Sequence, residues 1–101
     1  MLGRYTAGQT SDPRDLLPFL EAHDGATLWA MCAFGAREAA CAVTAIALGG
    51  HARVGFENNL LLPDGSVAPD NAALVRKAAA GSALCGRPIA SADDVRRLFG
   101  T

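Results

Sequence analysis

The sequence predicts an α/β fold built from βα units, because strand-like apolar runs alternate with helix-forming segments. The run 28–34 is apolar without alternation, which is typical of a strand covered on both faces in a parallel sheet. The alanine-rich segment 36–48 predicts a helix that is apolar nearly all round and ends at Gly49-Gly50. A short strand is expected over 52–56. Two strands joined by a helix predict a right-handed parallel crossover.

The N-terminal segment extends this pattern. A short strand is expected near Leu2–Tyr5, and a helix is expected over Pro13–Ala22. Asp12 is a good N-cap for that helix, and Pro13 suits its first turn. Because Pro18 lies inside the predicted helix and lacks a backbone donor, we expect a kink or a break there.

The C-terminal part predicts a small hairpin and two helices. Residues 60–68, with a Pro-Asp-Gly sequence at their middle, are typical of a hairpin or a protruding loop. Asp70 is expected to cap a helix over 71–84. Ser91 begins a capping-box pattern that predicts a last helix over 92–99.

These elements do not make a closed fold. About three βα units form an open sheet with two unpaired edges, whereas two apolar strands and an apolar helix need to be covered. The 101 residues are enough for one compact domain with one core. The sequence therefore predicts a single partial domain over residues 1–101 that belongs to a larger parallel sheet.

Charge and cysteine content exclude several function classes. Nine Lys and Arg residues against ten Asp and Glu residues give a net charge of −1, so no basic field is available to attract nucleic acid or an anionic membrane surface. No apolar run is long enough to span a bilayer. The three cysteines are widely spaced and odd in number, which predicts reduced, buried thiols. We therefore expect a cytoplasmic protein that binds neither nucleic acid nor membrane.

The segment after the second predicted central strand is the richest in polar groups. In parallel α/β folds, function gathers at the C-terminal ends of strands. Arg53, Gly55, Glu57, Asn58 and Asn59 occur there within seven residues. An arginine, a carboxylate and amides, beside a glycine that permits close backbone approach, suit an anionic substrate next to a metal or a proton transfer.

A longer motif surrounds these residues. The run GGHARVGFENN (49–59), followed by LLLPDG, APDNAALV and SADDVRRLFG, resembles the end of the β-keto acid cleavage enzymes. The upstream GRYTAGQTSDPRDLLPFL resembles the same family, so the resemblance covers the whole chain as roughly the last third of a family protein. It implies an α/β fold consisting of the C-terminal βα units of a (β/α)8 TIM barrel, with the barrel incomplete in this chain.

The resemblance also implies an activity. Family members convert a β-keto acid and acetyl-CoA into acetoacetate and a new acyl-CoA, with a divalent metal, usually Zn2+, as cofactor. It therefore implies a β-keto acid and acetyl-CoA as partners of this chain, and a homo-oligomer for the full-length protein.

Three residues take roles from the resemblance. Glu57 matches the carboxylate metal ligand, and Arg53 matches the arginine of an Arg–Asp dyad that deprotonates the substrate. The aspartate of that dyad falls on Asn58, and an amide cannot accept a proton as a carboxylate does, so Asn58 could orient the substrate but could not be the base. The other family ligands are an HxH pair that the sequence lacks. We therefore expect the chain alone neither to bind zinc tightly nor to cleave β-keto acids.

Other interpretations of these residues stay open. Glu57 could be an exposed loop carboxylate, and Arg53 could form a structural ion pair, with Glu57 as one candidate partner. His51 is more typical of a hydrogen-bonded structural histidine than of a second ligand. For the whole chain, the alternative is a small non-catalytic α/β protein that oligomerises or binds a partner through exposed apolar edges.

Overall fold

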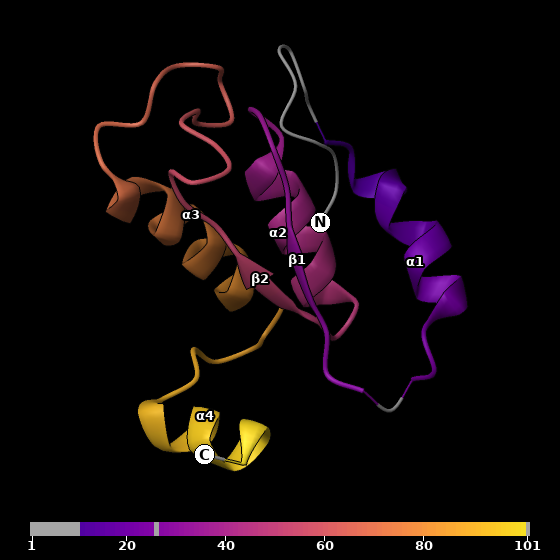
Figure 1. Cartoon of the computed structure of the whole chain (residues 1–101). Coiled ribbons are helices and arrows are strands. Elements are labelled where there is room, and N and C mark those ends of the chain that lie inside the picture. The colour runs from indigo at the N-terminus through magenta and orange to yellow at the C-terminus, as the bar shows by residue number, and fades with distance from the viewer. Residues whose placement is uncertain (1–10, 26, 101) are drawn as a thin grey trace.

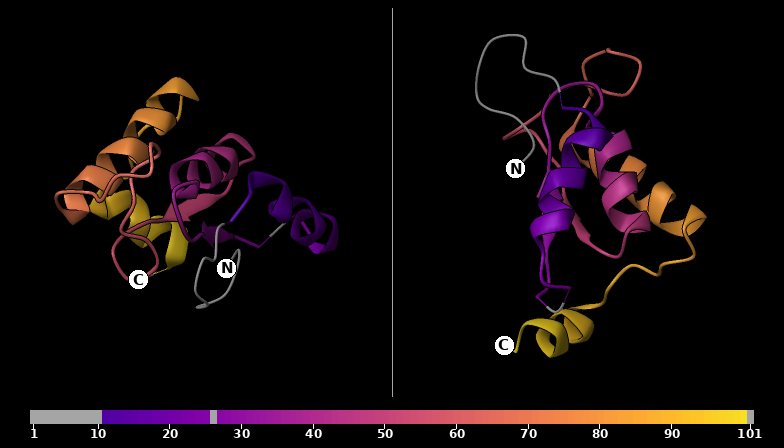
Figure 2. Two further views of the ribbon diagram at one scale, coloured as in Figure 1. Left: turned by 90° about the horizontal axis from the view of Figure 1, so that it is seen from above. Right: turned by 90° about the vertical axis from the view of Figure 1, so that its right-hand side faces the viewer.

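A computed structural model describes residues 11–25 and 27–100. In this part of the chain, a parallel pair of strands lies beside a row of helices, with α2 in the middle, α1 on one side and α3 on the other (Figures 1 and 2). The elements, in chain order, are the 3-10 helix η1 (Pro13–Leu16), α1 (Leu17–Ala22), β1 (Ala30–Cys32), α2 (Glu38–Ala47), β2 (His51–Arg53), α3 (Asn71–Leu84) and α4 (Ala92–Phe99). The predicted strand Leu2–Tyr5 lies outside the described residues.

The two strands are parallel, as the sequence predicts. Ala30 pairs with His51, and Cys32 pairs with Arg53, so the C-terminal ends of both strands lie at the same edge. Both strands are shorter than predicted. Beyond β1 the backbone no longer follows β2, because Phe34 pairs with Ser11 instead: the Ser11 N–H donates to the Phe34 carbonyl over 2.9 Å, and the Phe34 N–H donates to Ser11 Oγ over 2.9 Å.

Helix α2 is the centre of the packing. The core consists of buried residues from η1, the β1 region and α2, namely Leu16, Met31, Ala33, Cys41, Ala42 and Ala45. The small α2 side chains let the helix lie close to the strands. Helix α3 also approaches α2 closely, because a Cβ at Gly81 would clash with Val43. At the C-terminal end of α2, the Arg87 guanidinium donates to the Ile46 carbonyl over 2.8 Å, which suits the negative end of the helix dipole.

The predicted helix Pro13–Ala22 is present as two pieces rather than one kinked helix. Residues Pro13–Leu16 form η1, and α1 begins at Leu17, so Pro18 lies in the first turn of α1 and not in a helix interior. The backbone stays helical at Leu16 and Leu17, so the chain changes from 3-10 to α geometry just before Pro18 without a break. A proline lacks the N–H that a helix interior requires but is tolerated in the first turn.

The C-terminal helices agree with the prediction. Helix α3 spans Asn71–Leu84, and the Asp70 carboxylate accepts from the Ala73 N–H over 2.8 Å. Helix α4 begins with the predicted capping box at Ser91. An antiparallel bridge between Leu61 and Val67 confirms the hairpin. Within residues 11–25 and 27–100, no helix combines the length and the apolar character needed to cross a membrane.

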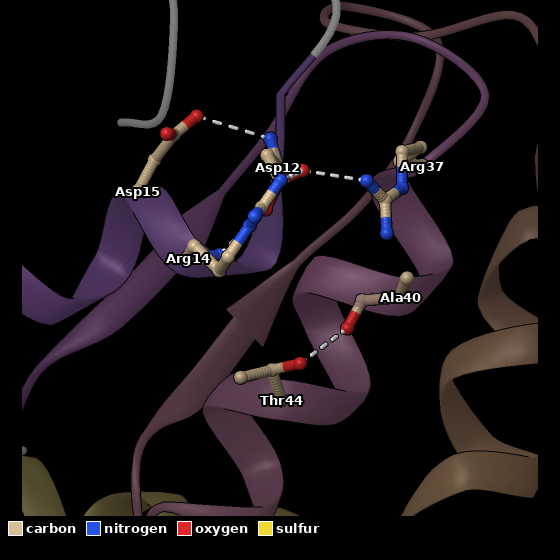
Figure 3. Close-up of polar contacts among 6 residues, drawn as sticks. All are labelled: Asp12, Arg14, Asp15, Arg37, Ala40 and Thr44. Atoms are coloured by element: carbon tan, nitrogen blue, oxygen red, sulfur yellow. Dashed lines mark hydrogen bonds and ion pairs between the residues drawn. The ribbon is translucent and has the colours of Figure 1, made fainter.

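Asp12 ties the first helix to α2 (Figure 3). Its carboxylate accepts from the Arg14 N–H over 2.8 Å, as the predicted N-cap, and pairs with the Arg37 guanidinium over 2.6 Å. The Asp12 N–H donates in turn to the Asp15 carboxylate over 3.0 Å. Hydrogen bonds from the Arg14 side chain and backbone are the main causes that lower the pKa of Asp12 from 3.8 to about 2.

We expect Asp12→Ala to lower the Tm at neutral pH, because it removes the cap and the Arg37 ion pair. Since the pKa of Asp12 is depressed in the folded state, its contribution is fully present above pH 3.8 and is lost as the pH falls towards about 2. The Tm difference from the wild type, measured by circular dichroism, should therefore shrink over that interval. Glu21→Ala, on the exposed side of α1, is the matched control. A Tm difference that persists unchanged at pH 2 would contradict the assignment.

Candidate functional site

The end of β2 forms a tight polar turn. The strand ends at Arg53 instead of continuing to Phe56 as predicted, because the chain turns at Gly55, whose φ is 144°. The Gly55 carbonyl accepts from the N–H groups of Asn58 over 3.2 Å and Asn59 over 3.1 Å. The turn therefore places Glu57 and Asn58 directly after the C-terminal end of a parallel strand.

Gly55 is required at this turn for two reasons. Its positive φ is one that residues with a Cβ rarely adopt. A Cβ built on Gly55 would also lie 2.9 Å from Asn71 Oδ1, the atom that accepts from the Phe56 N–H over 3.0 Å. The first residue of α3 therefore braces the same turn from outside.

Arg53 and Glu57 form an ion pair across the turn. The sequence analysis names Glu57 as one candidate partner of Arg53, and the pair is open to solvent, which leaves Arg53 accessible to a ligand. Of the two side chains, 57% and 67% respectively are exposed. Exposed ion pairs contribute little stability, so a ligand could replace one partner at small cost.

Asn58 lies beside Glu57 in the same turn and is half-buried. The structure therefore brings together the three residues that the sequence singled out, Arg53, Glu57 and Asn58. His51 lies at the other end of β2, where its ring packs against Phe99 with the centroids 6.0 Å apart.

The sequence analysis did not identify Glu38, which lies under the turn. Glu38 is 2% exposed, and its carboxylate accepts from the Gly55 N–H and from Asn59 Nδ2, each over 3.2 Å. Burial raises the pKa of Glu38 above its ordinary value, although the hydrogen bonds from Asn59 and Gly55 oppose the shift. The one sequence feature that could have pointed to Glu38 is that it is the single carboxylate in a mainly apolar helix, where it occupies the first turn.

Asn59 completes the inner side of the turn. It is 5% exposed, and its amide donates to the Leu61 carbonyl over 2.7 Å while accepting from the Leu61 N–H over 2.9 Å. The Asn59 side chain is therefore held by backbone on one side and by Glu38 on the other.

The described residues do not form a complete metal site. Across residues 11–25 and 27–100, no group of three or more His, Cys, Asp or Glu side chains is placed to hold a metal ion. A catalytic zinc generally takes three protein ligands and one open position. Glu57 can supply one carboxylate, so the residues present do not by themselves fit a zinc ion.

The cysteines offer no nucleophile at this turn. All three are free, and Cys32 and Cys41 are buried as predicted. The prediction was wrong for Cys85, which is exposed at the C-cap position of α3. Burial raises the pKa of the Cys41 thiol to about 11, so this side chain is protonated and unreactive at neutral pH.

We expect the Arg53–Glu57 pair to be nearly irrelevant to stability. Glu57→Gln should change the free energy of unfolding by about 1 kcal/mol or less, because both side chains are exposed. Leu74→Ala is the positive control, since Leu74 is buried and such a truncation costs about 2–5 kcal/mol. Urea denaturation followed by tryptophan fluorescence measures both. A loss in Glu57→Gln as large as that in Leu74→Ala would show that the pair is structural.

Fold and site together define a segment of a parallel α/β protein with a polar, solvent-accessible turn at a strand end. The beta-keto acid cleavage enzyme family matches residues 1–101, and the chain belongs to this family.

Curated relatives match most of the chain. It is 33% identical to the 3-keto-5-aminohexanoate cleavage enzyme of Acetoanaerobium sticklandii over 93 residues, which cover 92% of this chain and 34% of that protein. The enzyme of the same name from Fusobacterium nucleatum is 33% identical over 89% of this chain and 33% of its own length. The 3-oxoadipate:acetyl-CoA acetyltransferase of Cupriavidus necator is 39% identical over 71% of this chain and 25% of its own length. The chain thus spans about a third of the length of the first two relatives.

Proposed function

We propose that this chain is the C-terminal part of a metal-dependent (β/α)8-barrel enzyme that cleaves β-keto acids by acyl transfer with acetyl-CoA. The observation that carries the proposal is the exposed Arg53–Glu57 pair at the C-terminal end of a parallel strand, in a chain that matches the family along its whole length. In barrels of this kind, active sites are built at the C-terminal ends of the strands.

The proposed substrate is an anionic 3-oxo acid. The relatives are named for 3-keto-5-aminohexanoate and 3-oxoadipate, which share a carboxylate and a β-keto group, and one name includes acetyl-CoA as the co-substrate. The guanidinium of Arg53 suits a carboxylate, or the negative charge that develops on an enolate during C–C cleavage. Once a substrate anion engages Arg53, Glu57 is released from the ion pair.

Each of the other two residues has a distinct proposed role. Glu57 contributes a single carboxylate ligand to a zinc ion whose remaining ligands come from elsewhere in the complete enzyme, because the described residues do not form the whole site. Asn58 orients the substrate through its amide. It cannot accept a proton as an aspartate would, so the reaction in a protein with Asn58 is slow or uses another base.

Exposed apolar side chains support the proposal that this chain is a segment of a larger fold. Among the described residues, thirteen large hydrophobic side chains are exposed, with Val67 at 70%, Leu84 at 89% and Ile89 at 69%, and so many are unusual in a complete small domain. The same residues favour the second candidate, a non-catalytic α/β protein that oligomerises through these surfaces. That candidate predicts no turnover in any context, so one assay separates the two.

The test is a chimera of the Acetoanaerobium sticklandii enzyme in which the segment matched by this chain is replaced by the chain itself. Acetoacetate formation from a panel of 3-oxo acids with acetyl-CoA is followed alongside zinc content by atomic emission. We expect weak turnover in the chimera, and a rise in kcat of about 100-fold or more in Asn58→Asp, the size of a restored general base. Glu57→Ala should lose both zinc and turnover.

The isolated chain serves as a control in the same assay and should form no acetoacetate and hold no stoichiometric zinc. Folded chimeras that stay inactive with both Asn58 and Asn58→Asp would contradict the proposed function. Stoichiometric zinc in the isolated chain that disappears in Glu57→Ala would contradict the incomplete-site part of the proposal.

A further inference from the structure

The buried carboxylate of Glu38 has no part in the function proposed above. It lies in the first turn of α2, while the turn at the end of β2 comes 17 to 21 residues later in the chain. We propose that Glu38 is a positioning residue, which clamps the turn 55–59 and so holds Glu57 and Asn58 at the strand end. The structural role of Glu38 in the turn can be tested by itself, whereas its role in catalysis rests on the proposed function.

The two hydrogen bonds of Glu38 lie on either side of the residues that they would position. Oε2 accepts from the backbone N–H of Gly55, which precedes Glu57 by two residues. Oε1 accepts from the side-chain amide of Asn59, which follows Glu57 by two residues. One rigid carboxylate therefore holds both ends of a five-residue turn, using separate oxygen atoms.

Each group in the clamp depends on the other groups. Gly55 is buried, and the loss of its acceptor would leave the Gly55 N–H without the partner seen here, which is unfavourable inside a protein. The Asn59 amide uses one proton for the Leu61 carbonyl and the other for Glu38, so its orientation is fixed. A carboxylate with two acceptor oxygens matches the two donors that face it.

A purely structural alternative exists for the same residue. A carboxylate in the first turn of a helix interacts favourably with the helix dipole, and Glu38 could serve only to stabilise α2. The two roles predict different results. Loss of a dipole interaction weakens α2 and the packing on it, whereas loss of a clamp loosens the turn 55–59 and leaves α3 unchanged.

The experiment is amide hydrogen exchange by NMR on the full chain, comparing wild type with Glu38→Gln. A glutamine keeps the shape and one acceptor, but its NH2 group faces the NH2 group of Asn59. We expect the amides of Gly55, Asn58 and Asn59 to exchange about tenfold faster or more, and those of α3 to stay within about twofold. The Gly55 amide proton should also shift upfield, because it loses a charged acceptor. Glu21→Gln, on exposed α1, is the matched control.

A second variant removes the other partner of the clamp. Asn59→Ala should loosen the same amides with Glu38 intact, which keeps the test available if Glu38→Gln unfolds the chain. Unchanged exchange at the turn in both variants, or a uniform rise across α3, would overturn the clamp.

These measurements need no turnover. A clamp confirmed by exchange together with an inactive Asn58→Asp chimera would mean that the proposed function fails while the structural inference stands. An active chimera with unchanged exchange in Glu38→Gln would mean the reverse.

Discussion

The close packing of α2 on the two parallel strands is the constraint on which the rest of the structure depends. Cys41, Ala42 and Ala45 are fully buried between the helix and its neighbours, and their small size sets how near the helix axis can come to the strands. Gly81 allows α3 to pack closely on α2 as well. Because α2 is the crossover between β1 and β2, its position fixes the parallel register and brings both strand ends to one edge.

The candidate site follows from this geometry. A crossover helix begins at the edge where the preceding strand ends, so the first turn of α2 lies near the end of β2 as well. That placement gives Glu38 access to the turn that carries Glu57 and Asn58. Burying a carboxylate is unfavourable unless it is well hydrogen-bonded, and the raised pKa of Glu38 reflects that penalty. By contrast, Arg53 and Glu57 remain in solvent, where they can exchange partners.

Features set by neighbouring residues could be predicted from the sequence, and features set by distant contacts could not. The bounds of α3 and the caps at Asp12 and Ser91 depend on a few residues of local chain. Strand lengths depend on partners, and β1 is short because the backbone beyond it pairs with Ser11. The role of Glu38 could not be predicted from the sequence, because its partners are far along the chain. A glutamate at the start of a helix is also explained by its favourable interaction with the helix dipole.

The parallel pairing of β1 and β2 is the central claim, since an antiparallel arrangement would separate the strand ends and remove the site. Backbone nuclear Overhauser effects on the isotopically labelled chain test it directly. The account predicts amide-to-Hα contacts between the strands in the register that pairs Met31 with Ala52. Strong Hα-to-Hα contacts between the two strands, which are typical of antiparallel pairs, or a register shifted by one residue, would contradict it.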